Sequence, residues 1–394
     1  MSLPKSRTVL IALSSIMSIR MLGLFMILPV FSVAAAHMPG ATATLVGLAL
    51  GMYGLTQSLL QIPFGMLSDR IGRKPVILLG LFLLLIGSIV AAFSHSIYFL
   101  IIGRALQGAG AIGSTVLALL ADLTSEQSRS KAMAFMGLSI GFAFTLAMIA
   151  GPVINHWFHL SGIFFATGLL ALIGISLVST IPTPSKPLKT SEKKFVEIIG
   201  NTQLLRLDAG IFFLHAILTA LFVAVPILLT REIQLSSLHQ ILMYLFILII
   251  SFMCALPFII IGEKKQKIKP IFISAIATIF IVQVGLYFFH RDLIAMVILL
   301  FVFFAAFTLL EATLPSLVSK IAPAKNKGAA MGIYSSSQFF GIFVGGSVGG
   351  WVFEHAHLSG VFALSAVIAC VWFSVACTMQ QPPYLSKNTN CGKE

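Results

Sequence analysis

The chain has 394 residues, of which 58% are hydrophobic and only 9% are charged. Ordinary soluble domains are about 45–50% apolar and about 25% charged, so this composition excludes a cytosolic enzyme and a disordered protein and leaves a polytopic membrane protein. The formal net charge of +13 comes from basic residues spread between apolar runs rather than gathered on one face, which argues against a nucleic-acid partner.

Apolar runs of helix length follow one another along the whole chain. A bilayer core about 30 Å thick needs about 20 apolar residues per helix, and the runs are of that length. They are continuous, without the alternation of a membrane β-barrel. The sequence therefore predicts an all-α membrane protein with twelve transmembrane helices. The expected spans are 8–36, 42–66, 75–93, 97–121, 131–154, 161–181, 207–230, 239–261, 270–289, 294–318, 328–352 and 359–379.

The positions of lysine and arginine predict the orientation of these spans in the membrane. Nearly all of the 25 basic residues fall in loops on one side, with Arg231 and Arg291 as the exceptions in outer loops. Basic loops are retained in the cytoplasm. We therefore expect a multi-pass membrane protein with both termini cytoplasmic.

The longest polar stretch lies near the middle of the chain and divides the spans into two sets of six. Sequences on either side resemble each other: IPFGMLSDRIGRKP at 62–75 aligns with LPFIIIGEKKQKIK at 256–269, and KAMAF at 131–135 aligns with AAMGI at 329–333. Internal repeats of this kind build transporter folds. We predict two pseudo-symmetric six-helix bundles joined by a linker. The bounds are 1–181 for the N-terminal bundle, 182–206 for a cytoplasmic linker, 207–379 for the C-terminal bundle and 380–394 for a cytoplasmic tail.

Three short motifs resemble those of the major facilitator superfamily. GMLSDRIGRKP at 65–75, between the second and third spans, meets every defined position of the pattern GxLxDRxGRK. GRALQGAG at 103–110 is similar to the motif of the fourth helix. GFAFTLAMIAGP at 141–152 is similar to the antiporter motif of the fifth helix, but Asn155 and His156 stand where a second glycine pair is expected.

Longer stretches, such as SIRMLGLFMILPV, EATLPSLVSK and MGIYSSSQFFG, look most like the YajR-like branch of bacterial facilitators. That resemblance implies a major facilitator fold in the inner membrane of a bacterium. It also implies proton-driven drug efflux, an antiport by alternating access. Some members of the branch end in a soluble C-terminal domain, which we expect this chain to lack. The expected partners of a monomer are a small-molecule substrate, protons and lipid, with no cofactor or metal. Enzymatic activity is not expected, because the sequence contains neither a nucleotide-binding loop nor paired catalytic acids.

Charged residues gather at the expected cytoplasmic ends of spans two to four. An acidic group there can meet the partly positive N-terminus of a helix, and either Arg70 or Arg73 can pair with Asp122. By resemblance, these residues form a latch between the halves that holds the outward-open state, with Asp69 facing the start of span eleven. Asp69 or Asp122 could also exchange a proton at the mouth of the cavity. The residues assigned to this conformational latch are Gly65, Asp69, Arg70, Gly72, Arg73, Lys74 and Asp122.

Four ionisable residues lie well inside the predicted spans, where such groups usually face a cavity or a partner. Arg20 and Arg104 stay protonated and therefore cannot carry a proton. Burial disfavours the charged forms of Glu311 and His215, so these two are the candidate carriers, with Glu311 first. By resemblance, Arg104 belongs to the proton-coupling set as the electrostatic element that favours ionisation of a neighbouring acid.

An apolar cavity with few polar groups would suit amphipathic compounds, and their export is the leading functional hypothesis. The alternative is transport of an anionic metabolite or siderophore, because Arg20 and Arg104 have no acid at depth in their own half. A non-transporting sensor is a third reading, which the transport motifs disfavour. The residues expected to line the substrate cavity are Arg20, Tyr53, Gln57, Gln61, Gln338 and Phe339.

Span eleven carries a glycine repeat. Gly341, Gly345 and Gly349 recur every four residues and fall on one side of a helix. Small residues at this spacing let another helix approach closely. We therefore expect a tightly packed partner helix along this side.

Overall fold

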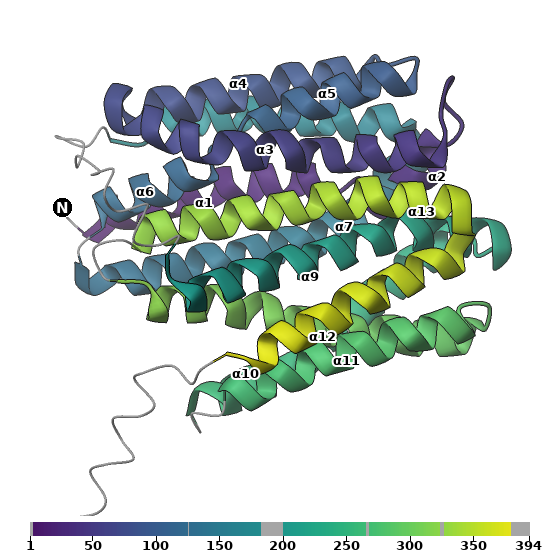
Figure 1. Ribbon diagram of the computed structural model, residues 1–394. Helices are drawn as coiled ribbons and strands as arrows, with labels where there is room; N and C mark the ends of the chain where they lie inside the picture. The colour runs from purple at the N-terminus through teal and green to yellow at the C-terminus, as the bar shows by residue number, and fades with distance from the viewer. Residues whose placement is uncertain (1–2, 125, 183–199, 265–267, 324–326, 380–394) are drawn as a thin grey trace, which may run out of the picture.

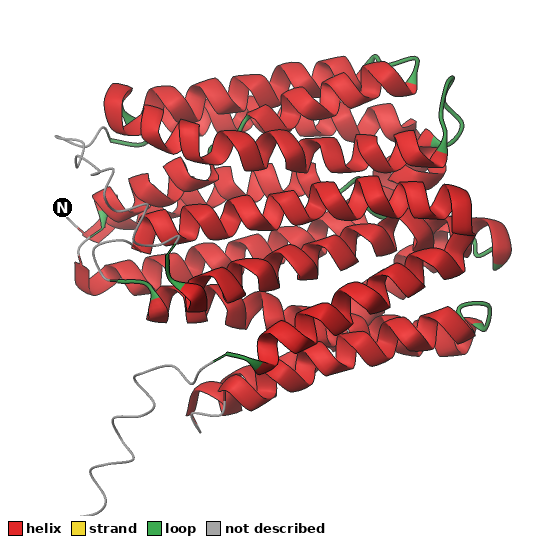
Figure 2. Cartoon of the chain, viewed as in Figure 1, coloured by secondary structure: helices red, strands yellow, loops and turns green. Residues whose placement is uncertain are grey.

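The computed structural model describes residues 3–124, 126–182, 200–264, 268–323 and 327–379. Every regular element within these ranges is a helix, and most of the helices run side by side along one common direction (Figures 1 and 2). The expected linker lies mostly, and the expected C-terminal tail entirely, outside the described residues.

The helices form two groups, before and after the middle of the chain, which we call the N-terminal half and the C-terminal half. The first contains α1 (Leu3–Phe25), α2 (Phe31–Ala35), α3 (Ala43–Ile71), α4 (Arg73–Ala92), α5 (Ile97–Ala109), α6 (Gly113–Leu123) and α7 (Glu126–Ser179). The second contains α9 (Thr202–Ile227), the π-helical turn η1 (Leu228–Glu232), α10 (Ser237–Lys264), α11 (Ile268–Phe289), α12 (Leu293–Ile321) and α13 (Lys327–Cys377).

Two of these helices are too long to cross a bilayer once. α7 has 54 residues and α13 has 51, so at about 1.5 Å per residue each exceeds twice the hydrocarbon thickness of about 30 Å. Each bends at a histidine with positive φ, His159 (56°) and His357 (55°). The described chain contains ten helices long and apolar enough to cross a membrane. Dividing α7 and α13 at their bends gives the twelve segments expected from the sequence.

Three helix ends differ from their predicted bounds for local reasons. The sequence predicts a first span to residue 36, but α1 ends at Phe25 because the ring of Pro29 would clash with the carbonyl four residues earlier. The fourth span breaks between α5 and α6, in a glycine-rich segment around Gly110 that disfavours helix. α9 begins at Thr202, inside the expected linker, because the Asn201 side chain accepts two backbone N–H bonds of its first turn, at 3.0 and 3.3 Å.

The helices of each half pack mainly on one another. In the N-terminal half, α1 packs on α7, and α4 packs on α5 and α7; in the C-terminal half, α13 packs on α9 and α11, and α10 packs on α12. The halves meet chiefly through α3 against α13, α7 against α10 and α2 against α9. α3 and α13 lie next to each other in Figure 1.

One row of glycines on α13 packs against α9. A Cβ atom added to Gly341 or Gly345 would overlap carbonyl oxygens of α9, and one added to Gly349 would lie 3.1 Å from the Cα of Ala220. The repeat seen in the sequence therefore joins two helices of the C-terminal half.

A second row on α13 faces the other half. A Cβ added to Gly346 would lie 2.7 Å from the carbonyl oxygen of Gly47, and one added to Gly350 would lie 2.8 Å from the Cα of Gly47. On α3, a Cβ added to Gly51 would lie 2.7 Å from the carbonyl oxygen of Phe343. Backbone therefore meets backbone across the halves. The sequence reading did not single out this second row.

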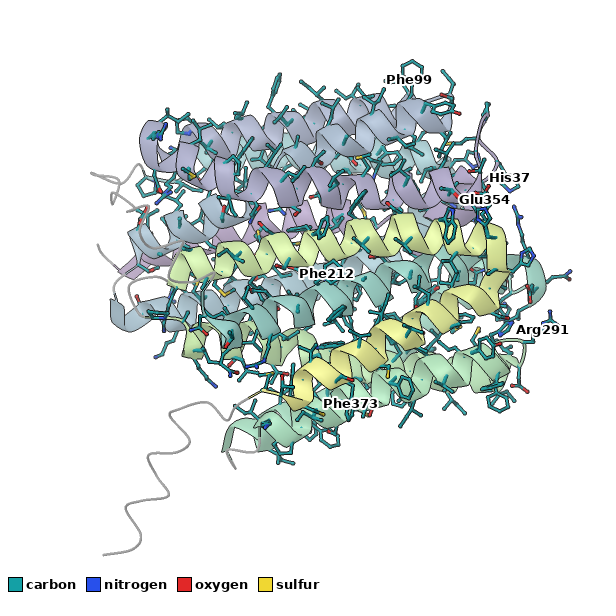
Figure 3. All side chains as sticks on the ribbon, in the orientation of Figure 1. His37, Phe99, Phe212, Arg291, Glu354 and Phe373 are labelled. Atoms are coloured by element: carbon teal, nitrogen blue, oxygen red, sulfur yellow. The ribbon has the colours of Figure 1, made fainter. Side chains whose placement is uncertain are left out.

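The perimeter of the helices is apolar and their ends are polar. Large exposed side chains such as Trp157 (72%) and Phe142 (71%) cover the sides, which suits a surface in contact with lipid. Figure 3 shows His37, Arg291 and Glu354 at one end of the helices, where α3 begins. We call this end the opposite face, and the end where α4 and α9 begin the basic face.

Candidate functional site

Two arginines of the N-terminal half lie on either side of Tyr53 on α3. The guanidinium carbon of Arg104, on α5, is 4.9 Å from the centre of the tyrosine ring. Nε of Arg20, on α1, donates to the tyrosine hydroxyl at 3.5 Å. All three side chains are buried, with at most 1% of their surface exposed. The structure therefore brings together residues that the sequence analysis assigned to two roles, the cavity and proton coupling.

Glutamines hold both arginines in place. Gln57, in the amide orientation that satisfies both of its ends, accepts from Nη2 of Arg20 at 2.7 Å, and its amide lies 2.9 Å from that of Gln61. Nη1 of Arg104 donates to Gln107 at 2.7 Å. Gln107 was read from the sequence only as part of a family motif. The arginine cluster, as we call it, comprises Arg20, Tyr53, Gln57, Arg104 and Gln107.

Three nitrogens of the arginine cluster make no hydrogen bond to the described residues. Nη1 of Arg20 and both Nε and Nη2 of Arg104 have no hydrogen-bond partner among the described residues, and we call them the orphan nitrogens. None of the ion pairs formed by carboxylates in the described part of the chain includes Arg20 or Arg104. A buried polar group without a partner is costly, so the cluster is incomplete as it stands.

In the C-terminal half, an acid and a histidine on different helices share one amide partner. One amide group of Gln338, on α13, lies 2.9 Å from Nε2 of His215 on α9 and 3.3 Å from Oε1 of Glu311 on α12. An amide has two N–H donors, so it can donate to both. Nδ1 of His215 faces the carbonyl of Ile211 at 3.3 Å, so Nδ1 is the donor in this contact. His215 and Glu311 are 3.9 Å apart.

Two further buried groups belong to this region. Asp208 on α9 and Tyr334 on α13 are 6% and 4% exposed, and Tyr334 lies within electrostatic range of both Asp208 and Glu311. Asp208 precedes His215 by seven residues, so it lies on the same side of α9, about 10 Å nearer the basic face. The seven-residue spacing from His215 was visible in the sequence. Asp208 was nevertheless not selected as a site residue, because it stands at the edge of its predicted span. The carboxylate cluster comprises Asp208, His215, Glu311, Tyr334 and Gln338.

Phe339 separates the two clusters. Its ring centre lies 5.5 Å from the guanidinium carbon of Arg20 and 6.3 Å from the centre of the Tyr53 ring. It follows Gln338 directly on α13. Neighbouring residues of one helix therefore contact the clusters of both halves.

The predicted latch residues lie at the basic face. Arg73 pairs with Asp69 one turn earlier, and Nε of Arg73 lies 3.1 Å from Oδ2 of Asp122. Arg70 is exposed, so Arg73 is the arginine that pairs with Asp122. Both ion pairs lie within the N-terminal half.

The remaining latch residues shape the turn between α3 and α4. Gly72 has a φ of 100°, which only glycine adopts readily. Nζ of Lys74 donates to the carbonyl of Ile181 at 2.7 Å and so connects the start of α4 to the end of α7. A Cβ added to Gly65 would lie 3.4 Å from Oγ of Ser114, a close contact between α3 and α6.

Polar bonds join the halves at the opposite face. Oε2 of Glu354, beyond the second glycine row, accepts from the backbone N–H of Thr44 at 2.8 Å, in the first turn of α3. Oγ of Ser32 on α2 donates to the carbonyl of Phe222 on α9 at 2.8 Å. Sequence reasoning found neither bond, because each joins positions far apart in the chain.

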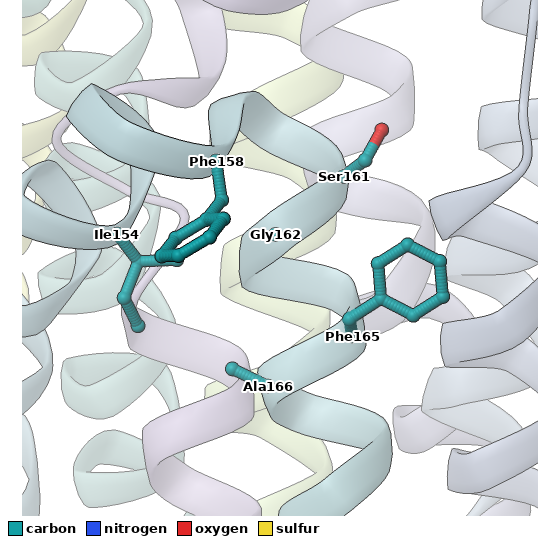
Figure 4. Close-up of a pocket in the computed structure, with 6 residues that line it drawn as sticks. All are labelled: Ile154, Phe158, Ser161, Gly162, Phe165 and Ala166. Carbon is teal, nitrogen blue, oxygen red and sulfur yellow. The ribbon is translucent and has the colours of Figure 1, made fainter.

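Two cavities of the described structure are small or peripheral. One of about 10 Å³ lies beside Arg104 and is lined by Phe25, Leu50 and Ile342, among other apolar residues. A larger one, of about 410 Å³, lies at the bend of α7, between Ile154 and Phe158 (Figure 4). Its lining is apolar, includes exposed phenylalanines and contains none of the predicted site residues.

The fold, the motifs and the two buried clusters can now be compared with known proteins. A sequence profile of the Major Facilitator Superfamily matches residues 13–310 and 207–390. The chain belongs to this superfamily of membrane transporters, as its motifs indicated.

The similar proteins are themselves transporters. The chain is 44% identical to the inner membrane transport protein YajR of Escherichia coli, over 97% of this chain and 86% of that protein. It is 28% identical to the quinolone resistance protein NorA of Staphylococcus aureus, over 50% of each chain. A bacterial homologue of the lysosomal transporter Spinster, solved in an inward-facing, unoccupied conformation, superposes with a TM-score of 0.73 at 14% identity, covering 96% of this chain and 98% of that one. The chain is thus a non-enzymatic inner membrane transporter.

Proposed function

We propose that this transporter exports small amphipathic compounds in exchange for protons, by alternating access between its halves. The two moving bundles comprise residues 1–181 and 207–379, the limits expected from the sequence. The basic face lies in the cytoplasm. The observation that carries the proposal is the Gln338 bridge between Glu311 and His215. It supports a proton-binding site at depth, in a half without buried arginines among the described residues.

The division of chemistry between the halves favours Glu311 as the carrier. Arg20 and Arg104 keep their protons, so the N-terminal half has no group at that depth that can exchange one. The side chain of Glu311 is 36% exposed, whereas that of His215 is 1% exposed. Glu311 is therefore the more accessible of the two groups, and Gln338 connects it to His215.

The contacts between the halves support an inward-facing state. They concentrate at the opposite face, where Gly346 and Gly350 meet α3 and Glu354 caps it. Near the basic face, a Cβ added to Gly328 or Gly332 of α13 would meet nothing within 4 Å. We infer that the latch residues Asp69 and Arg73 contact α13 in the alternate, outward-facing state.

Transport in everted membrane vesicles tests the proposal. A growth-inhibition screen in a pump-deficient bacterium, with and without the gene, first identifies an exported compound. An acidic vesicle interior should drive its accumulation. The Glu311→Gln variant should lose this pH-driven accumulation while it still exchanges labelled for unlabelled compound, because the amide keeps the shape of the site without its titratable proton.

Glu232→Gln is the matched control, since it makes the same chemical change on the opposite face. Glu232 is 40% exposed and lies 3.8 Å from Arg291, which is 84% exposed, and such surface pairs contribute little. Full pH-driven accumulation by Glu311→Gln would refute the assignment of the carrier. If the wild-type protein accumulates the compound to the same level with and without a pH gradient, proton coupling itself is refuted.

A further inference from the structure

The orphan nitrogens point to a ligand that the chain does not supply. Arg20 and Arg104 are permanently charged and at most 1% exposed. Their contacts are neutral: a tyrosine, two glutamines and the Phe339 ring. A buried cation is normally balanced by an anion, and here none of the described residues provides one.

The orphan nitrogens of Arg104 have the geometry of a binding edge. Nη1 is occupied by Gln107, which leaves Nε and Nη2. These two donors form one side of the planar guanidinium, and their parallel N–H bonds match the two oxygens of a carboxylate. Nη1 of Arg20, on α1, is a third donor without a partner.

The cavity that Arg104 lines is otherwise largely apolar. The small cavity beside Arg104 has walls from both halves, including Phe25 and Leu50 from one and Ile342 from the other. Its volume of about 10 Å³ barely reaches the space that one water molecule requires. A ligand can therefore enter only when α13 moves away, taking Phe339 and Ile342 with it.

We propose that the arginine cluster binds the carboxylate of the transported compound, which is therefore an amphipathic organic acid with its apolar part against the leucine and phenylalanine walls. The inference rests on the proposed function only for the direction of transport. Each cycle carries the substrate's negative charge out of the cell and one proton in, so two units of positive charge move inward in total. The membrane potential therefore adds to the pH gradient as a driving force.

Equilibrium binding to the purified full chain tests the site without any gradient. The probes are a panel of aromatic carboxylic acids, each paired with its own primary amide, so that the two members differ only in charge. At least one acid should bind about tenfold more tightly than its amide, as expected for a charge-assisted pair of bonds. Arg104→Gln and Arg20→Gln should each remove this preference, whereas Arg104→Lys should keep part of it. Arg291→Gln, on the opposite face, is the matched control.

A second variant covers the case in which loss of an arginine prevents folding. Gln57→Glu places a carboxylate beside Nη2 of Arg20 and keeps both arginines, so it should fold and lose the preference for acids. Acids that bind no more tightly than their amides would overturn the proposal, as would an unchanged preference in the arginine variants or in Gln57→Glu. Glu311→Gln should retain acid binding, so a failure of proton coupling and a failure of this site are distinguishable.

Discussion

The two halves share a backbone plan and carry opposite chemistry at its centre. The arginine cluster of the N-terminal half holds two buried cations and, among its described neighbours, no acid. The carboxylate cluster of the C-terminal half holds Asp208 and Glu311 and, in the described region, no arginine or lysine. The repeat therefore determines where helices lie, while single side chains give each half its own task.

The sharpest test of this contrast compares Arg104→Gln with Glu311→Gln. The exchange of labelled for unlabelled substrate, measured without a gradient, should fall about 10- to 100-fold in Arg104→Gln, because a charge-assisted pair of bonds is lost. It should remain largely intact in Glu311→Gln. If the two variants lose exchange equally, the halves do not divide substrate and proton between them.

The second comparison uses neighbouring glycines of α13. Gly345→Ala should lower the stability of the fold by about 1–3 kcal/mol, because its Cβ overlaps α9 within the C-terminal half. Gly346→Ala should leave the melting temperature nearly unchanged, since it disturbs only the contact with α3. It should instead increase the labelling of cysteines placed at the opposite face. Equal losses of melting temperature would contradict the assignment of the two rows.

A smaller effect is expected for Gln338→Leu, which removes the bridge between His215 and Glu311. Loss of these hydrogen bonds should slow pH-driven transport by about threefold to tenfold, since each has a net value of about 0.5–1.5 kcal/mol. The matched control is Gln283→Leu on α11, a buried amide outside both clusters. A similar loss in both variants would show that Gln338 serves packing only.

The smallest expected effect is one that the halves should share. His159 and His357 are exposed and hold equivalent positions, 198 residues apart, the same offset that separates KAMAF from AAMGI. Each has a backbone conformation that costs a non-glycine residue about 1–3 kcal/mol, part of which glycine's greater entropy loss offsets. His159→Gly and His357→Gly should therefore each raise the stability by about 1 kcal/mol, measured by thermal unfolding in detergent. A gain in one half alone would argue against the equivalence of the two bends.

Composition and motifs predicted the family and the all-helical fold, but the end of the first span was placed 11 residues too late, at residue 36 instead of Phe25. Local chemistry explains most differences, such as the end of α1 ahead of Pro29. The sequence also named Arg20, Tyr53 and Gln57, which lie together, but it could not tell that Arg104 shares their tyrosine, because depth along a helix does not reveal which way a side chain points.

Residues that act through another helix were the hardest to find. The repeat at Gly341 was visible as a spacing, whereas the role of Gly346 depends on which helix lies opposite. Glu354 accepts a hydrogen bond from Thr44, 310 residues away in the chain. A single sequence does not show which residues meet across such a separation. Asp208 was missed because a boundary was placed one residue away.

The backbone contact between α3 and α13 has a consequence for how this protein can diversify. Because main-chain atoms of Gly47 and Gly346 meet there, this contact requires small residues on both helices. Substitutions at Phe25, Leu50 or Ile342 can therefore change the shape of the cavity beside Arg104 while the glycine contact between α3 and α13 stays the same. The contact between the halves and the lining of the cavity therefore depend on different residues.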